Sequence, residues 1–283
     1  MTQKLIALVD GSPYSRSVCD AAAWIAQRAG LAVELMHVLG RREGGKGSDL
    51  SGSIALGARS ALLRNLTELD EQRAKLAAQH GRAILEDALA LLKSAGVDAT
   101  PHLRHGDVVE AITEKEAGSD LVVVGKRGEA AASPNVHLGS HLERAMRSVS
   151  KPLFVAAETF HPIERVLVAY DGSPSAMRAV DYLARSPVYA GLKTTVVTFG
   201  EDTEANHKLL DPAKAVLAGA GIEAATEVRA GQPDQALGGL VAEDAFDHLV
   251  MGSSGHTRFR AFFAGSTTME MLRVCPVPIL LVK

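Results

Sequence analysis

Two glycine motifs near the end of the chain combine residue types that can bind an anion. Gly252-Ser253-Ser254-Gly255 follows an apolar run over 246–251, and Gly265-Ser266 stands after nine intervening residues, at the start of a helical pattern. Glycine lets a backbone turn tightly and come close to a ligand, and the N–H groups at a helix start point toward negative charge. Ser266 occupies the N-cap position, where its hydroxyl can cap the helix or bind a phosphate oxygen. This order of strand, glycine loop and helix start predicts an anion site.

A purely structural role is the alternative, since many loops between a strand and a helix need glycine for geometry alone. The first half of the chain carries a related pattern, Gly125-Lys126-Arg127-Gly128 followed by Gly139-Ser140. Here ten residues separate the two motifs, and Pro134 lies among them. The extra residue could be absorbed as a bulge or could displace the anion-binding backbone. We therefore expect the motif in the second half to be the better site.

An internal repeat divides the chain into two similar halves. Asp10-Gly11-Ser12-Pro13 returns as Asp171-Gly172-Ser173-Pro174, each time after an apolar run. Both glycine motifs and the apolar runs that precede and follow them return in the same order. We predict two domains, over 1–157 and 158–283, joined by a linker near Ala157–Pro162 that is short enough for the domains to pack together.

Each half alternates short apolar runs with helical patterns, as parallel strands between two layers of helices do. In the first half we predict strands near 4–9, 32–38, 98–104, 120–124 and 152–156, and helices near 14–29, 60–95, 107–117 and 139–149. In the second half we predict strands near 164–170, 192–199, 222–229, 247–251 and 277–282, and helices near 174–186, 207–219, 233–243 and 265–274. Right-handed crossovers then give an α/β fold of two tandem doubly wound domains, each a five-stranded parallel sheet with helices on both faces.

The first half is longer because it carries an insertion after its second strand. Asp10 and Asp171 are 161 residues apart, whereas Gly106 and Gly231 are 125 apart, so the insertion adds 36 residues. It lies at about 40–80 and starts with a polar, glycine-rich run before a helical pattern. The apolar positions of that pattern are Leu62, Leu66, Leu69, Leu76, Ile84, Ala88 and Leu91. Their spacing fits an amphipathic helix over the sheet edge, and a regulatory or partner-docking element is the alternative.

Composition excludes several classes of protein. The formal net charge of the 283 residues is −3, and neither half has the basic excess of a nucleic-acid-binding domain. No apolar run approaches the roughly 20 residues that span a bilayer. The chain enters a strand-like run directly after Met1, without the pattern of a signal peptide, and Cys19 and Cys275 do not form a disulfide framework. We therefore expect a cytoplasmic protein that binds neither nucleic acid nor membrane.

The repeated Asp-Gly-Ser-Pro turn and the G-x-x-G, nine residues, G-S pattern resemble the universal stress protein family. Over almost its whole length the chain resembles a tandem member, with two such domains in one polypeptide. The resemblance implies an adenine nucleotide alpha hydrolase-like fold and a stress-response regulator or sensor. It also implies domains that pair with each other, often through the last strand, and it leaves a homodimer open. Part of the family binds ATP, whereas members without the glycine motif do not.

The resemblance further implies which residues hold ATP, with or without Mg²⁺. In ATP-binding members an aspartate at the end of the first strand lies beside the adenosine, and an apolar residue after the second strand forms a wall for adenine. The implied site of the second half is Asp171, Phe199, Met251, Gly252, Gly255, Gly265, Ser266 and Thr267. Its counterpart in the first half is Asp10, Val38, Gly125, Gly128, Gly139 and Ser140. Each Asp-Gly-Ser-Pro also fits an Asx turn before a helix, and the apolar candidates also fit a role in the core.

An enzyme is the first competing class. Adenylating enzymes of related fold need a Ser-Gly-Gly type loop after the first strand, where this chain has an aspartate and a proline that lacks an N–H donor. The sequence also lacks a Walker A lysine motif and a nucleophile elbow. His137 and His141 have the spacing of a metal pair, but no carboxylate motif accompanies them. We expect no catalytic residue and no metal site; slow ATP hydrolysis or autophosphorylation stays open as an alternative, but no identifiable catalytic group supports it.

A phospho-receiver domain shares the doubly wound plan, but it needs an acidic cluster where this chain has one aspartate. The serious alternative is a tandem stress-protein scaffold that does not bind ATP, or that binds another small or apolar ligand. Such a protein would keep the fold and the turns while its second pocket is filled by side chains or takes an apolar molecule.

Overall fold

The structure is a computed structural model that describes residues 4–40, 56–128, 140–253 and 266–283. The first half contains β1 (Lys4–Leu8), α1 (Tyr14–Ala29), β2 (Ala32–Gly40), α2 (Leu56–Ser94), β3 (Ala99–Gly106), α3 (Val108–Glu116), β4 (Leu121–Gly125), α4 (Ser140–Ser148) and β5 (Leu153–Ala156). The second half contains β6 (Arg165–Ala169), α5 (Pro174–Arg185), a 3₁₀ turn η2 (Pro187–Tyr189), β7 (Lys193–Phe199), α6 (Glu204–Gly219), β8 (Ala224–Arg229), α7 (Pro233–Glu243), β9 (His248–Gly252), α8 (Ser266–Val274) and β10 (Ile279–Val282). The predicted alternation of strands and helices is confirmed in both halves. The short turn η2 was not predicted.

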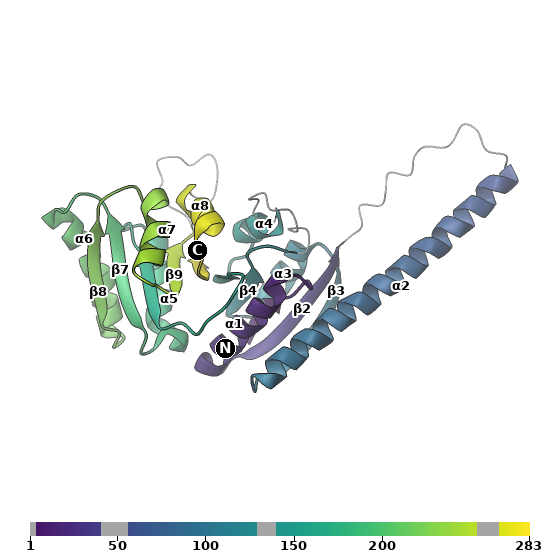
Figure 1. Ribbon diagram of the computed structural model, residues 1–283, viewed down its shortest axis with the longest axis horizontal. Helices are drawn as coiled ribbons and strands as arrows, with labels where there is room; N and C mark the ends of the chain where they lie inside the picture. The colour runs from purple at the N-terminus through teal and green to yellow at the C-terminus, as the bar shows by residue number, and fades with distance from the viewer. Residues whose placement is uncertain (1–3, 41–55, 129–139, 254–265) are drawn as a thin grey trace.

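The strands form a single sheet with the order β3-β2-β1-β4-β5-β10-β9-β6-β7-β8 (Figure 1). Within each half the five strands are parallel, as predicted. The two halves meet where β5 and β10 pair antiparallel, with Leu280 opposite Phe154. The chain is therefore two doubly wound halves joined edge to edge, and the pairing through the last strands matches what the family resemblance implied.

Helices cover both faces of the sheet and bury two apolar layers that run through both halves. One layer takes side chains from α1, α2, α5 and α6, among them Val18, Ile84, Leu183 and Leu210. The other takes side chains from α3, α4, α7 and α8, among them Ile112, Met146, Leu237 and Leu272. Because both layers cross the β5–β10 junction, the two halves share one core. Among the described residues, no helix is both long and apolar enough to cross a membrane.

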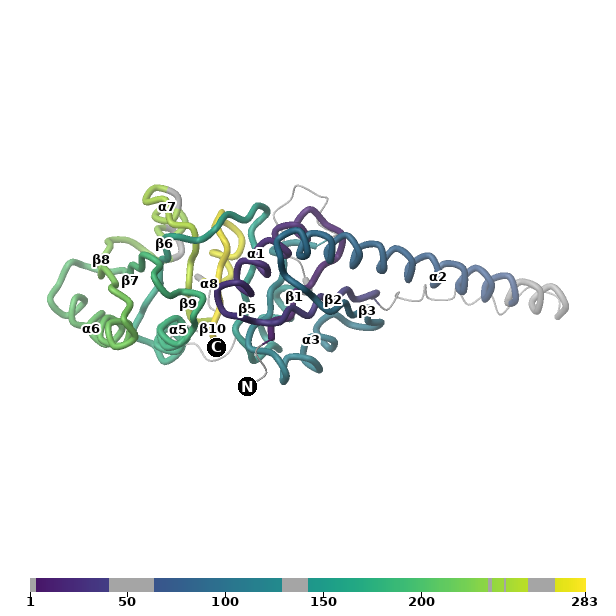
Figure 2. The backbone as a smooth tube through the Cα atoms, turned by 90° about the horizontal axis from the view of Figure 1, so that it is seen from below, coloured from purple at the N-terminus to yellow at the C-terminus, as the bar shows by residue number. Residues whose placement is uncertain are grey.

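Helix α2 is much longer than the strands that it covers. Its 39 residues extend about 58 Å at 1.5 Å per residue, whereas the eight residues of β3 extend about 27 Å. The C-terminal part packs on β2, β3 and α1, where Ile84 and Ala88 are buried. The N-terminal part continues past the edge of the sheet in both views (Figures 1 and 2).

The predicted apolar face of this helix is therefore only partly correct. Leu66, Leu69 and Leu76 are 48%, 48% and 63% exposed, although their spacing matches that of a buried face. The reason is geometric, because no strand lies beneath this part of α2. Leu91 is half-buried, and the side chain of Leu62 is outside the described set.

Candidate functional site

The carboxyl ends of β6, β7 and β9 bring the predicted residues of the second half together. Strand β6 lies between β7 and β9, and its Ala169 is level with Val197 and Met251. Asp171, two residues further, follows this central strand at the edge where Phe199 ends β7 and Gly252 ends β9. The crossovers leave β6 in opposite directions at this point, which makes it the topological switch point where ligands bind in sheets of this kind.

Asp171 is held in an Asx turn that leads into α5. Its Oδ1 accepts a hydrogen bond of 2.9 Å from the backbone N–H of Ser173. Ser173 in turn caps α5, since its Oγ accepts from the N–H of Ala176 at 3.1 Å, and Pro174 occupies the first turn. Asp171 itself is exposed. The structural interpretation of the turn is confirmed, and the turn fixes the carboxylate at the edge of the sheet.

Asp10 makes the equivalent turn in the first half, but its carboxylate accepts an additional hydrogen bond. Oδ1 accepts both from the N–H of Ser12, at 3.0 Å, and from Oγ of Ser15, at 3.2 Å. The equivalent of Ser15 in the second half is Ala176, so that Asp171 lacks this hydrogen bond. Gly128 lies against the same carboxylate, because a Cβ there would be 2.7 Å from Oδ2 of Asp10. In the first half the glycine motif therefore also lies beside the aspartate, but the carboxylate of Asp10 is already hydrogen-bonded to Ser15.

The first glycine of each motif is required by helix packing. A Cβ on Gly252 would lie 2.6 Å from the carbonyl carbon of Ser175 and 2.7 Å from the backbone nitrogen of Ala176. A Cβ on Gly125 would lie 2.8 Å from Cβ of Tyr14 at the start of α1. In both halves, the helix after the Asx turn therefore approaches the end of the neighbouring strand too closely for a side chain. This close approach explains both glycines without a ligand.

The apolar candidates differ in how far they are buried. Met251 is 5% exposed and belongs to the core layer under α7 and α8, so it cannot present a large surface to a base. Phe199 is half-buried against the same layer and keeps part of its ring at the edge. Val38, its counterpart, is half-buried beside Ile6 and Met36. Of the two apolar candidates in the second half, Phe199 is the one placed to contact a ligand.

Ser253 is a residue of the motif that we did not include in the predicted site. It is 8% exposed, and its backbone N–H is paired with the carbonyl of Val282 at 2.8 Å. Its hydroxyl is buried without a hydrogen-bond partner among the described residues. A buried hydroxyl without a partner is costly, so a hydrogen-bonding partner at the end of β9 would stabilise Ser253. Its position directly after the strand was the available signal in the sequence.

Several predicted residues lie outside the described part of the chain, namely Gly139, Gly255 and Gly265. The backbone of Ser140, Ser266 and Thr267 is described and begins α4 and α8, whereas their side chains are not. Because β9 and β10 are parallel, α8 must start at the carboxyl edge of the sheet and run back along it. Its N-terminus therefore lies on the same edge as Asp171, as predicted. The described residues contain no group of three or more His, Cys, Asp or Glu side chains that could hold a metal ion.

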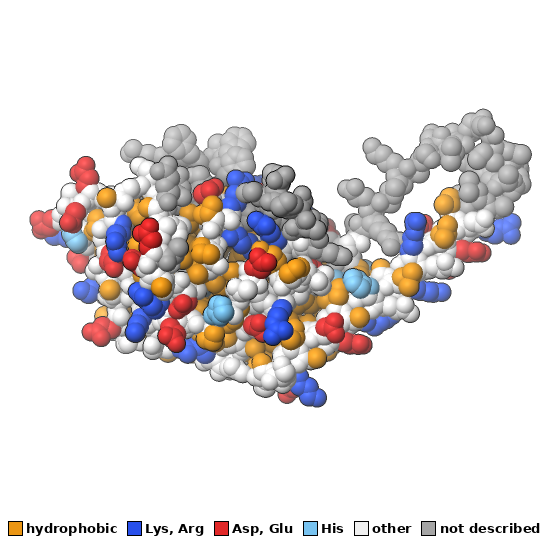
Figure 3. Space-filling model, viewed as in Figure 1, with side chains coloured by type: hydrophobic (Ala, Val, Ile, Leu, Met, Phe, Trp, Pro, Cys, Tyr) orange, Lys and Arg blue, Asp and Glu red, His pale blue; other side chains and the backbone are white. Residues whose placement is uncertain are grey.

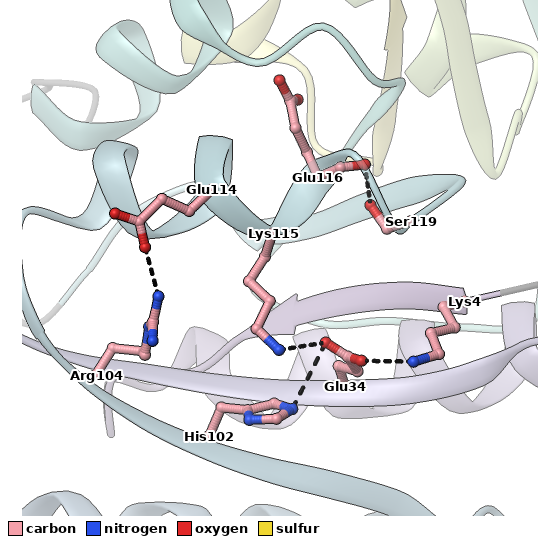
Figure 4. A network of polar contacts seen from close by, with 8 residues as sticks. All are labelled: Lys4, Glu34, His102, Arg104, Glu114, Lys115, Glu116 and Ser119. Atoms are coloured by element: carbon pink, nitrogen blue, oxygen red, sulfur yellow. Dashed lines mark hydrogen bonds and ion pairs between the residues drawn. The ribbon is translucent and has the colours of Figure 1, made fainter. Parts of the chain in front are cut away.

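A second polar cluster lies near the amino ends of β1 and β2 (Figure 4). Glu34 pairs with Lys4 at 3.0 Å and with Lys115 at 3.3 Å, and His102 stands 3.6 Å away. Burial alone would raise the pKa of Glu34, but the hydrogen bonds from the two lysines lower it below its ordinary value. Burial lowers the pKa of His102. The partners of Glu34 come from β1, β3 and α3, so this cluster ties elements together at the end of the sheet opposite to the candidate site.

Comparison with known proteins agrees with this architecture. The model of the universal stress protein family matches residues 1–157 and 162–283. The universal stress protein Slr1230 of Synechocystis sp. is 32% identical over 283 residues, which cover 98% of this chain and 99% of that protein.

Solved structures show the same fold. A universal stress protein from Archaeoglobus fulgidus DSM 4304 matches 100% of this chain and 99% of its own, with a TM-score of 0.73 and 23% identity. A universal stress protein in complex with cAMP matches 43% of this chain at 26% identity, but its TM-score of 0.38 is too low to relate its ligand site to this chain. Since the family model matches both halves and a relative is similar over nearly the whole length, the chain belongs to the universal stress protein family.

Proposed function

We propose that this protein is a stress-response regulator or sensor that binds ATP in its second half. The observation that carries the proposal is the meeting of three groups at one switch point of the sheet. Asp171 offers a fixed carboxylate, Phe199 a partly open ring, and Ser253 a buried hydroxyl without a partner among the described residues. A nucleotide has a hydroxyl-bearing ribose, a flat base and anionic phosphates, and each of these fits one group on this edge.

Each part of the nucleotide would have a defined partner. The carboxylate of Asp171 would accept hydrogen bonds from the ribose hydroxyls, and the ring of Phe199 would lie beside adenine. The first N–H groups of α8 would bind the phosphates, since a helix N-terminus attracts anions. Mg²⁺ would accompany the phosphates as it does in solution, without a dedicated set of protein ligands.

We propose one ATP site in each chain, because the first half differs at two points. The carboxylate of Asp10 already accepts a hydrogen bond from Ser15. The ammonium of Lys126, inside the first glycine motif, binds a backbone carbonyl of the other half at 2.8 Å and is thereby directed away from a phosphate. Both differences lower the affinity of this half for an anionic ligand.

We further propose that ATP acts by binding and not by turnover. The carboxylate that the described residues place at the site, Asp171, is engaged in the turn that starts α5. A general base must reach the proton that it removes, whereas this geometry holds the carboxylate for recognition. Binding would then report the nucleotide level to partners of the protein.

Isothermal titration with ATP and Mg²⁺ tests the proposal on the wild type and on two matched variants. We expect one site per chain, at least a tenfold weaker affinity for Asp171→Ala, and an unchanged affinity for Asp10→Ala. The variants remove the same side chain from the same turn in the two halves. Loss of affinity in Asp10→Ala alone would move the site to the first half. No binding by folded wild-type protein would refute the proposal.

A scaffold that does not bind ATP is the second candidate function. The packing of Gly252 and Gly125 against helix starts favours it, because these glycines are explained without a ligand. Under this function the turns and glycines only preserve the fold. Gly265→Val distinguishes the two candidates in the same titration. Only a protein that binds ATP gives a heat of binding that this substitution can remove.

A further inference from the structure

The projecting part of α2 is a long helical surface that the rest of the chain does not cover. Every residue from 64 to 76 is exposed, and contact with the body of the protein begins at residue 77. The elements that α2 contacts, β2, β3 and α1, lie under its C-terminal part. Figure 3 shows hydrophobic side chains along the projecting helix, outside the body of the molecule.

These hydrophobic side chains form a stripe. Leu66, Leu69 and Leu76 follow one another at spacings of three and seven residues, and Arg73 stands between them at the next position of the same pattern. This is the a/d repeat of a helix that packs along another helix. We name Leu66, Leu69, Arg73 and Leu76 the leucine stripe. Its members repeat at the spacing of one helix face, and all four are exposed.

A stripe of this kind favours a partner for two reasons. Exposed leucines on one face mark a surface that is covered in the working assembly. In addition, a helix without tertiary contacts is marginal in water even at about 12–15 residues. Most of the stability of a helix in a protein comes from packing of its apolar face, so burial of the stripe would stabilise the projecting segment. Both arguments call for a second element along the stripe.

The charges beside the stripe identify the second element as another copy of α2. Between Leu66 and Leu76 the acidic residues Glu68, Asp70 and Glu71 come first, and the basic residues Arg73 and Lys75 follow, whereas Arg64 lies before the stripe. Two parallel copies would place acid beside acid and base beside base. Two antiparallel copies would place the acidic block of each helix beside the basic block of the other, which is the favourable arrangement.

We propose that the leucine stripe is a self-association surface, on which α2 helices of two chains pair antiparallel about a two-fold axis near residue 71. Leu66 then lies level with Leu76 of the second copy, and Leu69 lies level with Arg73. The stem of Arg73 covers the apolar seam, while its guanidinium stays near the acidic block; within one helix it already stands 3.8 Å from Asp70. The same patch serves both chains, as a closed two-fold dimer requires.

Sedimentation equilibrium of the full-length protein tests the surface. We expect the wild type to be a dimer and Leu66→Glu/Leu69→Glu to be a monomer, with a dissociation constant raised at least 100-fold. Thr67→Glu/Ala74→Glu adds the same two negative charges to the same exposed segment outside the stripe and should stay dimeric. Far-UV circular dichroism controls for folding, because the exposed leucines make no contact with the sheet.

Distances between spin labels test the antiparallel arrangement, and the two native cysteines are buried and so remain unlabelled. In antiparallel helices centred on residue 71, labels at Gln72→Cys are about 3 Å apart along the axis and labels at Gln79→Cys about 24 Å apart, at 1.5 Å per residue. Parallel helices would give the same short separation at both positions. That result would overturn the proposal.

Other outcomes would also overturn it. A wild type that is still monomeric at 100 times the protein concentration of the sedimentation experiment would exclude a second copy as the partner of the leucine stripe. A dimer that persists in Leu66→Glu/Leu69→Glu would place the interface elsewhere. Binding of a monomeric wild type to phospholipid vesicles, lost in the same variant, would assign the stripe to a membrane surface. None of these results depends on ATP, so the proposed nucleotide function is tested separately, by the titration with ATP.

Discussion

Lys126, in the glycine motif of the first half, donates a hydrogen bond of 2.8 Å from Nζ to the backbone carbonyl of Cys275 in the second half. Cys275 directly follows α8, so the ammonium caps the C-terminus of the helix whose N-terminus faces the candidate site. Lys283 makes a contact in the reverse direction, from Nζ in the second half to the carbonyl of Arg147 in α4 of the first half at 2.8 Å. Two lysines thus link the halves beyond the β5–β10 pairing.

Removal of the Lys126 ammonium should weaken the junction of the halves. Lys126 is partly withdrawn from water, and this burial lowers the pKa of its ammonium. Lys126→Met keeps the apolar stem but leaves the carbonyl of Cys275 without this donor, and we expect the free energy of unfolding to fall by about 1–2 kcal/mol. Guanidinium denaturation measures this change. Lys208→Met, which removes an exposed ammonium paired with Glu204, should change it by about 0.5 kcal/mol or less.

Gly252 should not tolerate a side chain, whether or not ATP binds. Alanine at this position would bring Cβ to 2.6 Å from the backbone of Ser175, which cannot move without shifting α5. We expect Gly252→Ala to lower the free energy of unfolding by about 1–3 kcal/mol, the usual range for overpacking. Gly219→Ala is the matched control, since a Cβ there meets nothing within 4 Å. An unchanged thermal midpoint for Gly252→Ala would contradict the packing explanation.

His248 should make stability depend on pH below neutrality. Its ring is fully buried between Phe154 and Tyr189, with centroids at 5.1 and 5.8 Å. Because the carbonyl of Pro278 can only accept, Nδ1 donates to it at 2.9 Å, and Nε2 accepts from the hydroxyl of Tyr189 at 3.1 Å. This arrangement uses the neutral ring, and burial lowers the pKa of His248 to about 4.

The sign of the effect follows from the two pKa values. Above an ordinary histidine pKa of about 6.5 the folded and unfolded states are both neutral, and the stabilising contribution is complete. Between pH 6.5 and 4 only the unfolded state takes up the proton, so the free energy of unfolding should fall, by on the order of 3 kcal/mol in total. Urea denaturation from pH 7 to 4 measures this slope. His248→Gln should flatten it, whereas His207→Gln, which changes an exposed side chain, should leave it as in the wild type.

Glu116 should contribute to stability through backbone groups. It is 9% exposed, and its carboxylate accepts from the N–H of Ser150 at 2.8 Å, from Oγ of Ser150 at 3.1 Å and from the N–H of Lys151 at 3.3 Å. Glu116→Ala leaves both N–H groups without this acceptor, and we expect a loss of about 2–3 kcal/mol.

The control for Glu116 lies two residues away. Glu114 pairs with Arg104 at the surface, with 63% of its side chain exposed (Figure 4). Glu114→Ala should change stability by less than about 1 kcal/mol, as surface ion pairs do. Equal losses for the two alanine variants, measured by thermal denaturation, would show that the carboxylate of Glu116 has no special role.

The sequence alone determined the local structure of this protein. All ten predicted strands lie within about two residues of the observed ones. For the inner strands the signal was an apolar run, because a strand buried on both faces must be apolar along its length. The edge strands β3 and β8 instead carry polar residues and contain no buried residue. The repeated Asp-Gly-Ser-Pro predicted the Asx turns of Asp10 and Asp171, since that chemistry involves only neighbours in the chain. The order of the motifs placed Asp171, Phe199 and Gly252 on one edge, because parallel strands end together.

Only the tertiary structure decided contacts between segments distant in the chain. The pairing of β5 with β10 uses backbone groups that every sequence has, so only the family resemblance pointed to it. The spacing of Leu66, Leu69 and Leu76 cannot show whether this face of the helix packs on a sheet or faces solvent. The three leucines are exposed because the strands are too short to reach beneath them. Gly252 and Lys126 have the types expected of an anion site, yet one makes room for α5 and the other binds the end of α8. A side chain's type limits what it can contact, and the fold determines which of those contacts is within reach.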